Sequence, residues 1–254
     1  MNLIQSWQTA IPQLVPAVGL SVAFAFVAWG LRAVTAGAAL TGVFLTIILC
    51  VAAGPGALFP ILIVFLLTLI STRIGRRKKE RLGTGERRHG RGALQILANV
   101  GASALCAAPL IYVSHSIHSA THVRHILLAG ASAALAEAAG DTVSSELGQA
   151  FGSSPWLITT WRKIAPGQDG GITPIGTFFS LCAILMVCVS CEWARLLVPQ
   201  FYWTVFAAAF LGTIVDSFLG ATLERPDRLG NNAVNFSSTA FAAALAIGVL
   251  LAQR

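Results

Sequence analysis

Three of the chain's ten acidic residues, Glu137, Asp141 and Glu146, lie within ten positions of one another. They belong to the stretch A-E-A-A-G-D-T-V-S-S-E-L-G (Ala136–Gly148), at the end of an apolar segment typical of a membrane span. A charged side chain at membrane depth costs about 2.5–3.5 kcal/mol even on lenient insertion scales, so it needs a partner, a water-filled cavity or a metal ion. We interpret this stretch as the acidic half of a magnesium–phosphate site at the membrane surface.

The spacing of the acidic residues predicts which of them share a helix face. Glu137 and Asp141 are four apart and do share one, whereas Glu146 joins it only if the helix breaks or turns near the serines. Asp216 lies inside another apolar run, where an acidic residue is a functional-site hypothesis by default, although it could only pair with an Asn or Ser for packing. Asp141, Glu146 and Asp216 would together give Mg²⁺ the oxygen ligands it prefers, with water and phosphate completing the shell.

A glycine-rich loop, P-G-Q-D-G-G, is the candidate phosphate cradle. Its three glycines in five positions let backbone N–H groups converge on an anion, and the preceding Arg162 and Lys163 could neutralise phosphate charge. The alternative is an ordinary turn, and no Walker A pattern is present in the chain. The candidates here are Gly167, Asp169, Gly170 and Gly171 for phosphate binding and Lys163 for catalysis.

Four amides and one arginine near membrane depth are further candidates for phosphate contact. Arg91 opens an apolar segment at headgroup level, where it suits a lipid phosphate, although membrane topology alone also explains it. The amides could bind phosphate oxygens or hydrogen-bond between helices, a use worth about 0.6 kcal/mol. They are Asn99, Asn231, Asn232 and Asn235.

The composition of the 254 residues identifies an integral membrane protein. The chain is 56% hydrophobic and 11% charged, against about 25% charged in soluble domains. Its net charge of +7 does not indicate nucleic acid, because nine of the 17 Lys and Arg residues lie between Arg73 and Arg91, directly after an apolar span. Topology and anionic lipid explain that run, so we expect no nucleic-acid partner.

Runs of about 20 apolar residues predict an all-α, polytopic transmembrane bundle of about eight spans, with seven as the alternative. We expect one domain over 1–254, with a basic cytoplasmic loop at 73–91 and a cytoplasmic catalytic loop at 144–173. The first two spans are separated only by Leu31–Arg32–Ala33, so they could form a hairpin or a re-entrant pair. The expected spans are 14–31, 34–53, 57–72, 93–113, 125–143, 174–192, 201–220 and 235–252.

The distribution of Lys and Arg predicts the orientation of the chain. With the 73–91 loop in the cytoplasm and eight spans, 14 basic residues fall inside and three outside, which places both termini outside. The N-terminus has no basic segment typical of a cleavable signal peptide, so the first span would act as its own insertion signal. We expect a multi-pass protein, of the inner or cell membrane if bacterial, with its polar and glycine-rich features on the cytoplasmic side.

Two other groups of residues carry weaker signals. One outer loop contains four histidines with a 3-4-3 spacing, a plausible metal pattern that an interfacial polar segment also explains. Cys188 and Cys191 form a C-x-x-C at the end of a span, where helix packing is the preferred interpretation. The histidines are His115, His118, His122 and His125.

Five ordered stretches carry a resemblance that covers nearly the whole chain. They are G-R-G-A-L-Q-I-L-A-N (90–99), G-D-T-V-S-S-E-L-G (140–148), P-G-Q-D-G-G-I-T-P-I-G-T (166–177), D-S-F-L-G-A-T-L-E (216–224) and N-N-A-V-N-F-S-S (231–238). In order and spacing they resemble the membrane family called domain of unknown function 92, or transmembrane protein 19. Its characterised plant members are phytyl-phosphate kinases.

The resemblance implies phosphorylation of an isoprenyl monophosphate, such as phytyl or geranylgeranyl phosphate, by CTP or ATP with Mg²⁺. The family's D-T-x-x-S-E pattern falls on Asp141, Thr142, Ser145 and Glu146, and its P-G-x-x-G-G loop on Pro166, Gly167, Gly170 and Gly171. The expected partners are the lipid phosphate, the nucleotide and membrane lipid.

Two alternatives to the kinase remain at this point. The first is a membrane transporter of an anion or lipid, because intramembrane acids and glycine-broken segments are transporter features too. The second is a non-catalytic assembly protein. The sequence leaves open the isoprenoid length, the choice of donor, a homo-oligomeric state and the number of spans.

Overall fold

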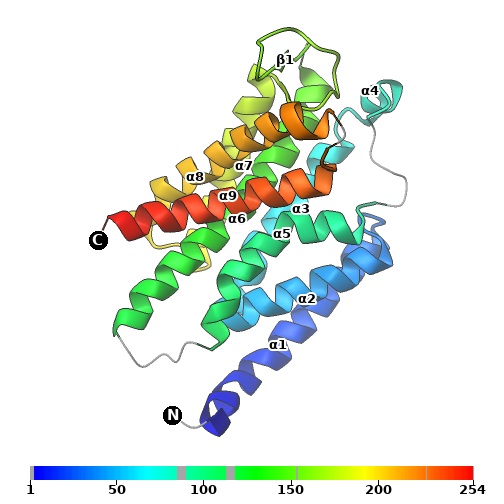
Figure 1. Cartoon of the computed structure of the whole chain (residues 1–254). Helices are drawn as coiled ribbons and strands as arrows, with labels where there is room; N and C mark the ends of the chain where they lie inside the picture. Colours follow the sequence, from blue (N-terminus) through cyan, green and yellow to red (C-terminus); the bar gives the residue numbers. More distant parts are fainter. Residues whose placement is uncertain (1–2, 85–89, 113–117, 153, 227, 254) are drawn as a thin grey trace.

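The computed structural model is a bundle of long helices capped at one end by a small hairpin (Figure 1). It describes residues 3–84, 90–112, 118–152, 154–226 and 228–253. The helices are α1 Leu3–Gly30, α2 Ala36–Ala53, α3 Leu58–Arg73, α4 Arg76–Arg81, α5 Ala93–Ala107, α6 His118–Phe151, α7 Pro174–Trp193, α8 Tyr202–Leu219 and α9 Asn231–Ala252. Short 3₁₀ turns are η1 Pro55–Ala57, η2 Ala108–Ile111 and η3 Pro199–Phe201, and η4 Gly220–Glu224 is a π-helical turn. The strands are β1 Trp156–Leu157 and β2 Gly171–Ile172.

Seven helices in the described part of the chain are long and apolar enough to cross a membrane. The all-α polytopic bundle predicted from the sequence is therefore confirmed. The remaining expected span, 14–31, corresponds to α1, whose apolar part, Val18–Gly30, is shorter than a full span. Because α1 packs against α2 and a short turn at Arg32 (φ 54°) joins them, these two helices form a hairpin. The seven are Ala36–Ala53, Pro55–Arg73, Ala93–Ile111, Thr121–Phe151, Pro174–Trp193, Pro199–Glu224 and Asn231–Ala252.

Helix α6 is the centre of the bundle. Some 89% of its most apolar window is buried, against 33–44% for the other candidate spans. It packs on α3, α5, α7, α8 and α9 (Figure 1). Its sequence from Ala129 to Ala139 is almost entirely small residues, which let neighbouring helices approach closely in a bilayer. Residues on α6 are thereby held from five sides.

Helix α6 is also longer than predicted, and this corrects the boundary of the 144–173 loop. The helix continues without a break to Phe151, so the connecting segment begins only at Gly152. Serines interrupt helices by bonding to nearby backbone, but Ser145 donates to the Thr142 carbonyl within the helix at 3.1 Å. The extension packs on the start of α7, where a Cβ on Gly176 would lie 2.8 Å from the Ser144 carbonyl oxygen.

The connecting segments that carry most of the basic and glycine-rich residues lie at one end of the bundle. The α1–α2 turn, α4, the β1–β2 hairpin and the starts of α5, α7 and α9 lie there, and both chain ends lie at the other (Figure 1). Backbone bonds tie two of these segments together, from Thr35 N to Arg91 O and from Arg91 N to Ala33 O, both at 3.0 Å. The predicted 73–91 loop thus contains helix α4, and its last residue joins the α1–α2 turn.

Candidate active site

Two carboxyl groups from different helices meet near this end of the bundle. Asp141 on α6 and Asp216 on α8 lie within hydrogen-bonding reach of each other. The Ser238 hydroxyl on α9 donates to Asp216 Oδ1 at 3.0 Å. Two carboxylates this close repel each other unless a proton or a cation lies between them. The structure thus brings together Asp141 and Asp216, two of the three residues that the sequence analysis assigned to a magnesium site.

A third carboxyl group, that of Glu137, lies one helical turn further into the bundle. It is 1% exposed, and neither oxygen makes a hydrogen bond of ordinary length with the described residues, although Ser238 is close enough to interact. It also interacts electrostatically with Asp141 and Asp216. It fits only because α8 has Gly212 opposite, where a Cβ would stand 2.6 Å from Glu137 Cγ. A buried, uncompensated carboxylate is costly, so this group requires a proton or a cation.

The glycine-rich loop forms the rim of the site. Gly170 has φ +75°, and a Cβ there would be 2.4 Å from that of Ala221, so only glycine lets the loop lie on η4. This contact places Asp169 where it acts electrostatically on Asp216 and Glu224. Gly167 (φ +84°) similarly lies against Thr84, after α4.

Glu224 and Asn231 complete the rim. Asn231 hydrogen-bonds to Glu224, which ends η4, and Glu224 acts electrostatically on Asp141. Nothing in the sequence prediction assigned Glu224 to the site. A signal existed, because Glu224 is eight residues after Asp216 in the same expected motif. The π-helical turn changes the register between the two, a feature that apolar periodicity does not reveal.

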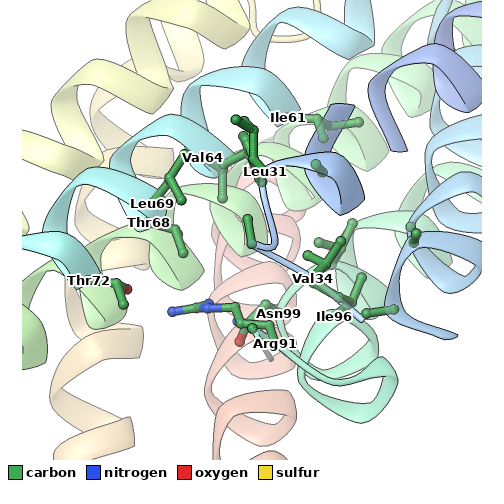
Figure 2. A pocket seen from close by; sticks show the side chains of 18 of the residues that line it. Leu31, Val34, Ile61, Val64, Thr68, Leu69, Thr72, Arg91, Ile96 and Asn99 are labelled. Carbon is green, nitrogen blue, oxygen red and sulfur yellow. The ribbon is translucent and has the colours of Figure 1, made fainter. Parts of the chain in front are cut away.

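Arg91 and Asn99 approach the carboxyl groups from the side of α5. Arg91 interacts electrostatically with Asp141, and Figure 2 shows its guanidinium extending across a cavity toward Thr72, with Asn99 beside its stem. Asn99 is 8% exposed, and its Oδ1 accepts from Asn235 Nδ2 at 3.4 Å. Asn99 and Asn235 therefore hydrogen-bond between α5 and α9, and their contact with phosphate stays a prediction.

The cavity beside Arg91 has a volume of about 510 Å³. It lies between the α1–α2 hairpin on one side and α3, α5 and α6 on the other. Figure 2 shows Val34 and Ile96 on one wall and Val64, Thr68 and Leu69 on the α3 wall. Its basic lining residues are Arg32, Arg73, Arg76, Lys79 and Arg91.

Glu146 does not join the other acidic residues, and this corrects its assignment as a metal ligand. It lies five residues after Asp141 on an unbroken helix, about 140° around the axis. Its carboxylate forms an ion pair with Lys79 and accepts a hydrogen bond from Thr72 at 3.2 Å. Within the described residues no three His, Cys, Asp or Glu side chains are grouped to hold a metal. Asp141 and Asp216 are left as the pair that could bind one with help from water or phosphate.

The ion pair of Glu146 involves a lysine that the sequence analysis counted only as a topology signal. Lys79 is 2% exposed, and its Nζ also donates to the Ser71 and Thr72 carbonyls at 3.0 and 2.8 Å. Those carbonyls are at the end of α3, where a cation is favourable. A basic run hides such a residue, because neither periodicity nor composition separates Lys79 from its exposed neighbours.

Other predicted residues lie further from the carboxyl groups. Arg162 and Lys163 are in the β1–β2 hairpin with exposed side chains, and no ion pair with a described residue involves them. Gly171 is part of strand β2 and pairs with Leu157. Asn232 lines a second cavity, which lies among α2, α5 and α9.

The outer histidines are only partly described. His115 lies outside the described residues, as do the side-chain surroundings of His118. His122 is in edge-to-face contact with Phe201, with ring centroids 6.3 Å apart. His125 is half-buried in α6.

Comparison with known proteins identifies the family. The family described as Integral membrane protein DUF92 matches residues 19–243. The chain belongs to this family.

Relatives in the DUF92 family come from bacteria, archaea and plants. An uncharacterised membrane protein of Synechocystis is 32% identical over 70% of this chain and 67% of its own length. An uncharacterised membrane protein of Methanocaldococcus jannaschii is 30% identical over 69% and 68%. Protein VTE6, chloroplastic, of Arabidopsis thaliana is 27% identical over 72% of this chain and 55% of its own. No solved structure matches the chain significantly.

Proposed function

We propose that this DUF92 protein is a membrane-embedded kinase that transfers a phosphoryl group from a nucleoside triphosphate to an isoprenyl monophosphate. One observation carries the proposal. The Asp141–Asp216 pair and Arg91 lie together at one end of an apolar bundle, beside a cavity whose lining changes from apolar to basic. Family membership and the similarity to VTE6 support the same function.

The proposed reaction forms one phosphoanhydride bond and breaks another. An oxygen of the acceptor monophosphate attacks the γ-phosphorus of the donor, the bond from that phosphorus to the β-phosphate oxygen breaks, and the nucleoside diphosphate leaves. The acceptor is already an anion at neutral pH, because the second pKa of a phosphate monoester is about 6. No strong general base is needed, so positioning and charge neutralisation supply the catalysis.

The residues on the acidic side fit a divalent cation. Mg²⁺ is commonly held by one or two carboxylates together with substrate phosphates, and Asp141 and Asp216 offer two carboxyl groups in contact. The buried Glu137, without a hydrogen bond of ordinary length, places a third carboxyl group behind them. When bound, the ion would neutralise phosphate charge during transfer.

The residues on the other side fit the phosphates. Arg91 would hold the acceptor phosphate, since a guanidinium binds phosphate in a bidentate manner, and Asn99 would orient Arg91 and the acceptor. The donor phosphates would occupy the rim formed by Asp169, Gly170 and Asn231. This rim is at the end of the bundle that the basic residues would place in the cytoplasm, where CTP and ATP are found.

The test is an assay on purified protein in nanodiscs with Mg²⁺, γ-labelled CTP or ATP, and phytyl or geranylgeranyl monophosphate. Labelled isoprenyl diphosphate is the expected product. Asp141→Asn should lower its formation by about 10²–10³-fold, whereas Glu192→Gln, at the opposite end of α7, should not. Folded protein that makes no diphosphate with any donor–acceptor pair would overturn the proposal and leave transport of an anion or lipid as the function to test.

A further inference from the structure

The cavity beside Arg91 has two kinds of lining. Apolar side chains of α1 and α3, including Phe24, Val64 and Phe65, form one part. Basic residues from the α1–α2 turn, the end of α3, α4 and the start of α5 form the other. An apolar space that ends at several cations is complementary to a single amphiphile with an anionic headgroup.

Two of these cations have no ion pair with any residue that the structure describes: Arg32 and Arg73. Arg76 pairs with Glu80 at 2.8 Å, and Lys79 is bound by Glu146 and two carbonyls. Arg32 and Arg73 both line the cavity and both are exposed. Their positive charge is therefore available to a bound anion, because no ion pair within the described residues uses it.

One aromatic pair bridges α1 and α3 beside the cavity. Helix α1 packs mainly on α2, and it lies at the edge of the bundle (Figure 1). Phe24 on α1 and Phe65 on α3 meet edge to face, with ring centroids 5.1 Å apart. Such a contact is worth about 0.5–1.5 kcal/mol beyond its buried area, so a lipid chain could displace it.

We propose that the isoprenyl chain of the acceptor lipid enters this cavity sideways from the bilayer, between α1 and α3, displacing Phe24 and Phe65. Arg32 and Arg73 then bind its phosphate beside Arg91. The identity of the acceptor rests on the kinase function proposed above. The cavity, its charge and its closure come from the geometry of this chain.

A second cavity is the competing location for the chain. It has a volume of about 500 Å³ and lies among α2, α5 and α9. Its lining is apolar apart from Asn232, with Phe44, Leu97 and Phe236 among the side chains, and no Lys or Arg contributes to it. It could take a hydrocarbon chain but offers a phosphate no cation.

The experiment measures binding without catalysis. A geranylgeranyl monophosphate analogue with a diazirine in its chain is added to the protein in nanodiscs without nucleotide, and the cross-linked peptides are mapped by mass spectrometry. Cross-links are expected on α1 and α3 near Phe24 and Phe65. Unlabelled geranylgeranyl monophosphate should compete at least tenfold better than geranylgeraniol, because only the phosphate meets the arginines.

Matched variants separate the two parts of the cavity. Arg32→Gln with Arg73→Gln should lower labelling at least tenfold, whereas Arg77→Gln, exposed and outside the cavity, should leave it unchanged. Phe24→Ala with Phe65→Ala should raise the labelling rate several-fold. Phe26→Ala, two residues along α1 and 68% exposed, should not.

Two results would overturn this inference: cross-links on α2, α5 and α9 around Phe44 and Phe236, or labelling that neither the arginine nor the phenylalanine variants change. The result is distinguishable from that of the kinase assay. Labelling as expected without any diphosphate would leave the lipid-phosphate site standing and remove the kinase. Diphosphate formation with cross-links in the second cavity would support the kinase and overturn the lipid-phosphate site proposed here.

Discussion

The carboxyl groups of Asp141 and Asp216 explain why residues of α6, α8 and α9 converge at one point. Each acidic side chain is costly at membrane depth, and their contact adds repulsion unless a proton or a cation lies between them, although Ser238 donates to Asp216. Arg91, just before α5, interacts electrostatically with Asp141. Phosphoryl transfer depends on positioning and on neutralising phosphate charge, and carboxyl groups that could hold a cation next to a guanidinium suit both tasks.

Replacing either member of this pair should remove activity without unfolding the protein. Asp141→Asn and Asp216→Asn keep the side-chain volume and lose the charge that would hold a cation. We expect diphosphate formation to fall by about 10²–10³-fold, the effect of losing one preorganised electrostatic group. Initial rates would measure the loss, and size-exclusion chromatography in detergent would verify folding. A variant with near-normal rates would remove that residue from the site.

Gly212 should tolerate no side chain, because Glu137 occupies the space beside it. A Cβ at Gly212 would lie 2.6 Å from Glu137 Cγ and 2.9 Å from Ala242 Cβ. Overpacking of this kind typically costs about 1–3 kcal/mol, so Gly212→Ala should lower the thermal unfolding temperature. Gly248→Ala on α9, with nothing within 4 Å of the added Cβ, is the control and should not. Equal effects would show that Glu137 is free to move aside.

The sequence predicts a site residue when the pattern that reveals it lies within one segment, and fails when the residue's role depends on contacts between helices. Asp141 and Asp216 stand out because a charge in an apolar run is conspicuous in one segment alone. Lys79 does not stand out, since it lies among eight other basic residues in the 73–91 region, and its burial depends on α3 and α6. Glu146 was wrongly assigned because its face depends on whether α6 continues past Ser144 and Ser145, which contacts with α7 decide.

The ion pair between Lys79 and Glu146 joins three helices. Lys79 follows α3 on α4, Glu146 is near the end of α6, and Thr72 of α3 also contacts that carboxylate. Lys79→Met should destabilise the protein by up to about 3–5 kcal/mol, because it leaves a partly buried carboxylate unpaired. Thermal unfolding in detergent measures this loss.

A double variant and an exposed pair control that prediction. Lys79→Met with Glu146→Met should be more stable than Lys79→Met alone, since the pair is then replaced by apolar packing. Arg76→Gln, which breaks an exposed pair with Glu80, should cost less than about 1 kcal/mol. If Lys79→Met behaved like Arg76→Gln, the ion pair would have no structural importance.

The predicted elements agree with the structure where hydrophobicity alone determines them. Helices α2, α7 and α9 begin within four residues of the expected spans and end within one. Helix α6 does not, because it also runs from Ser144 to Phe151, a polar stretch that packs on α7 and pairs with Lys79. The hairpin β1–β2 had no hydrophobic pattern to predict it and arises from backbone pairing around the glycine-rich loop.

The bundle as a whole has two different ends. The carboxyl groups, the glycine-rich loop and the basic segments are at one, and both chain ends are at the other (Figure 1). Alternating access in transporters places the binding site near the midplane, at the interface of repeats. A polar site confined to one end suits an enzyme whose water-soluble donor arrives from one side and whose lipid acceptor arrives through the bilayer.

The excess of Lys and Arg predicts that the site end faces the cytoplasm. One cysteine is added at a time, as Arg77→Cys or Thr160→Cys, at positions that are exposed at that end. Each should react with a membrane-impermeant maleimide in inverted vesicles and not in intact cells. A cysteine at Gln200, exposed at the other end, should react in intact cells. Wild-type protein supplies the background, because its five native cysteines are buried or half-buried. The opposite labelling would reverse the orientation and place the site away from cytoplasmic nucleotide, which would argue against CTP or ATP as donor.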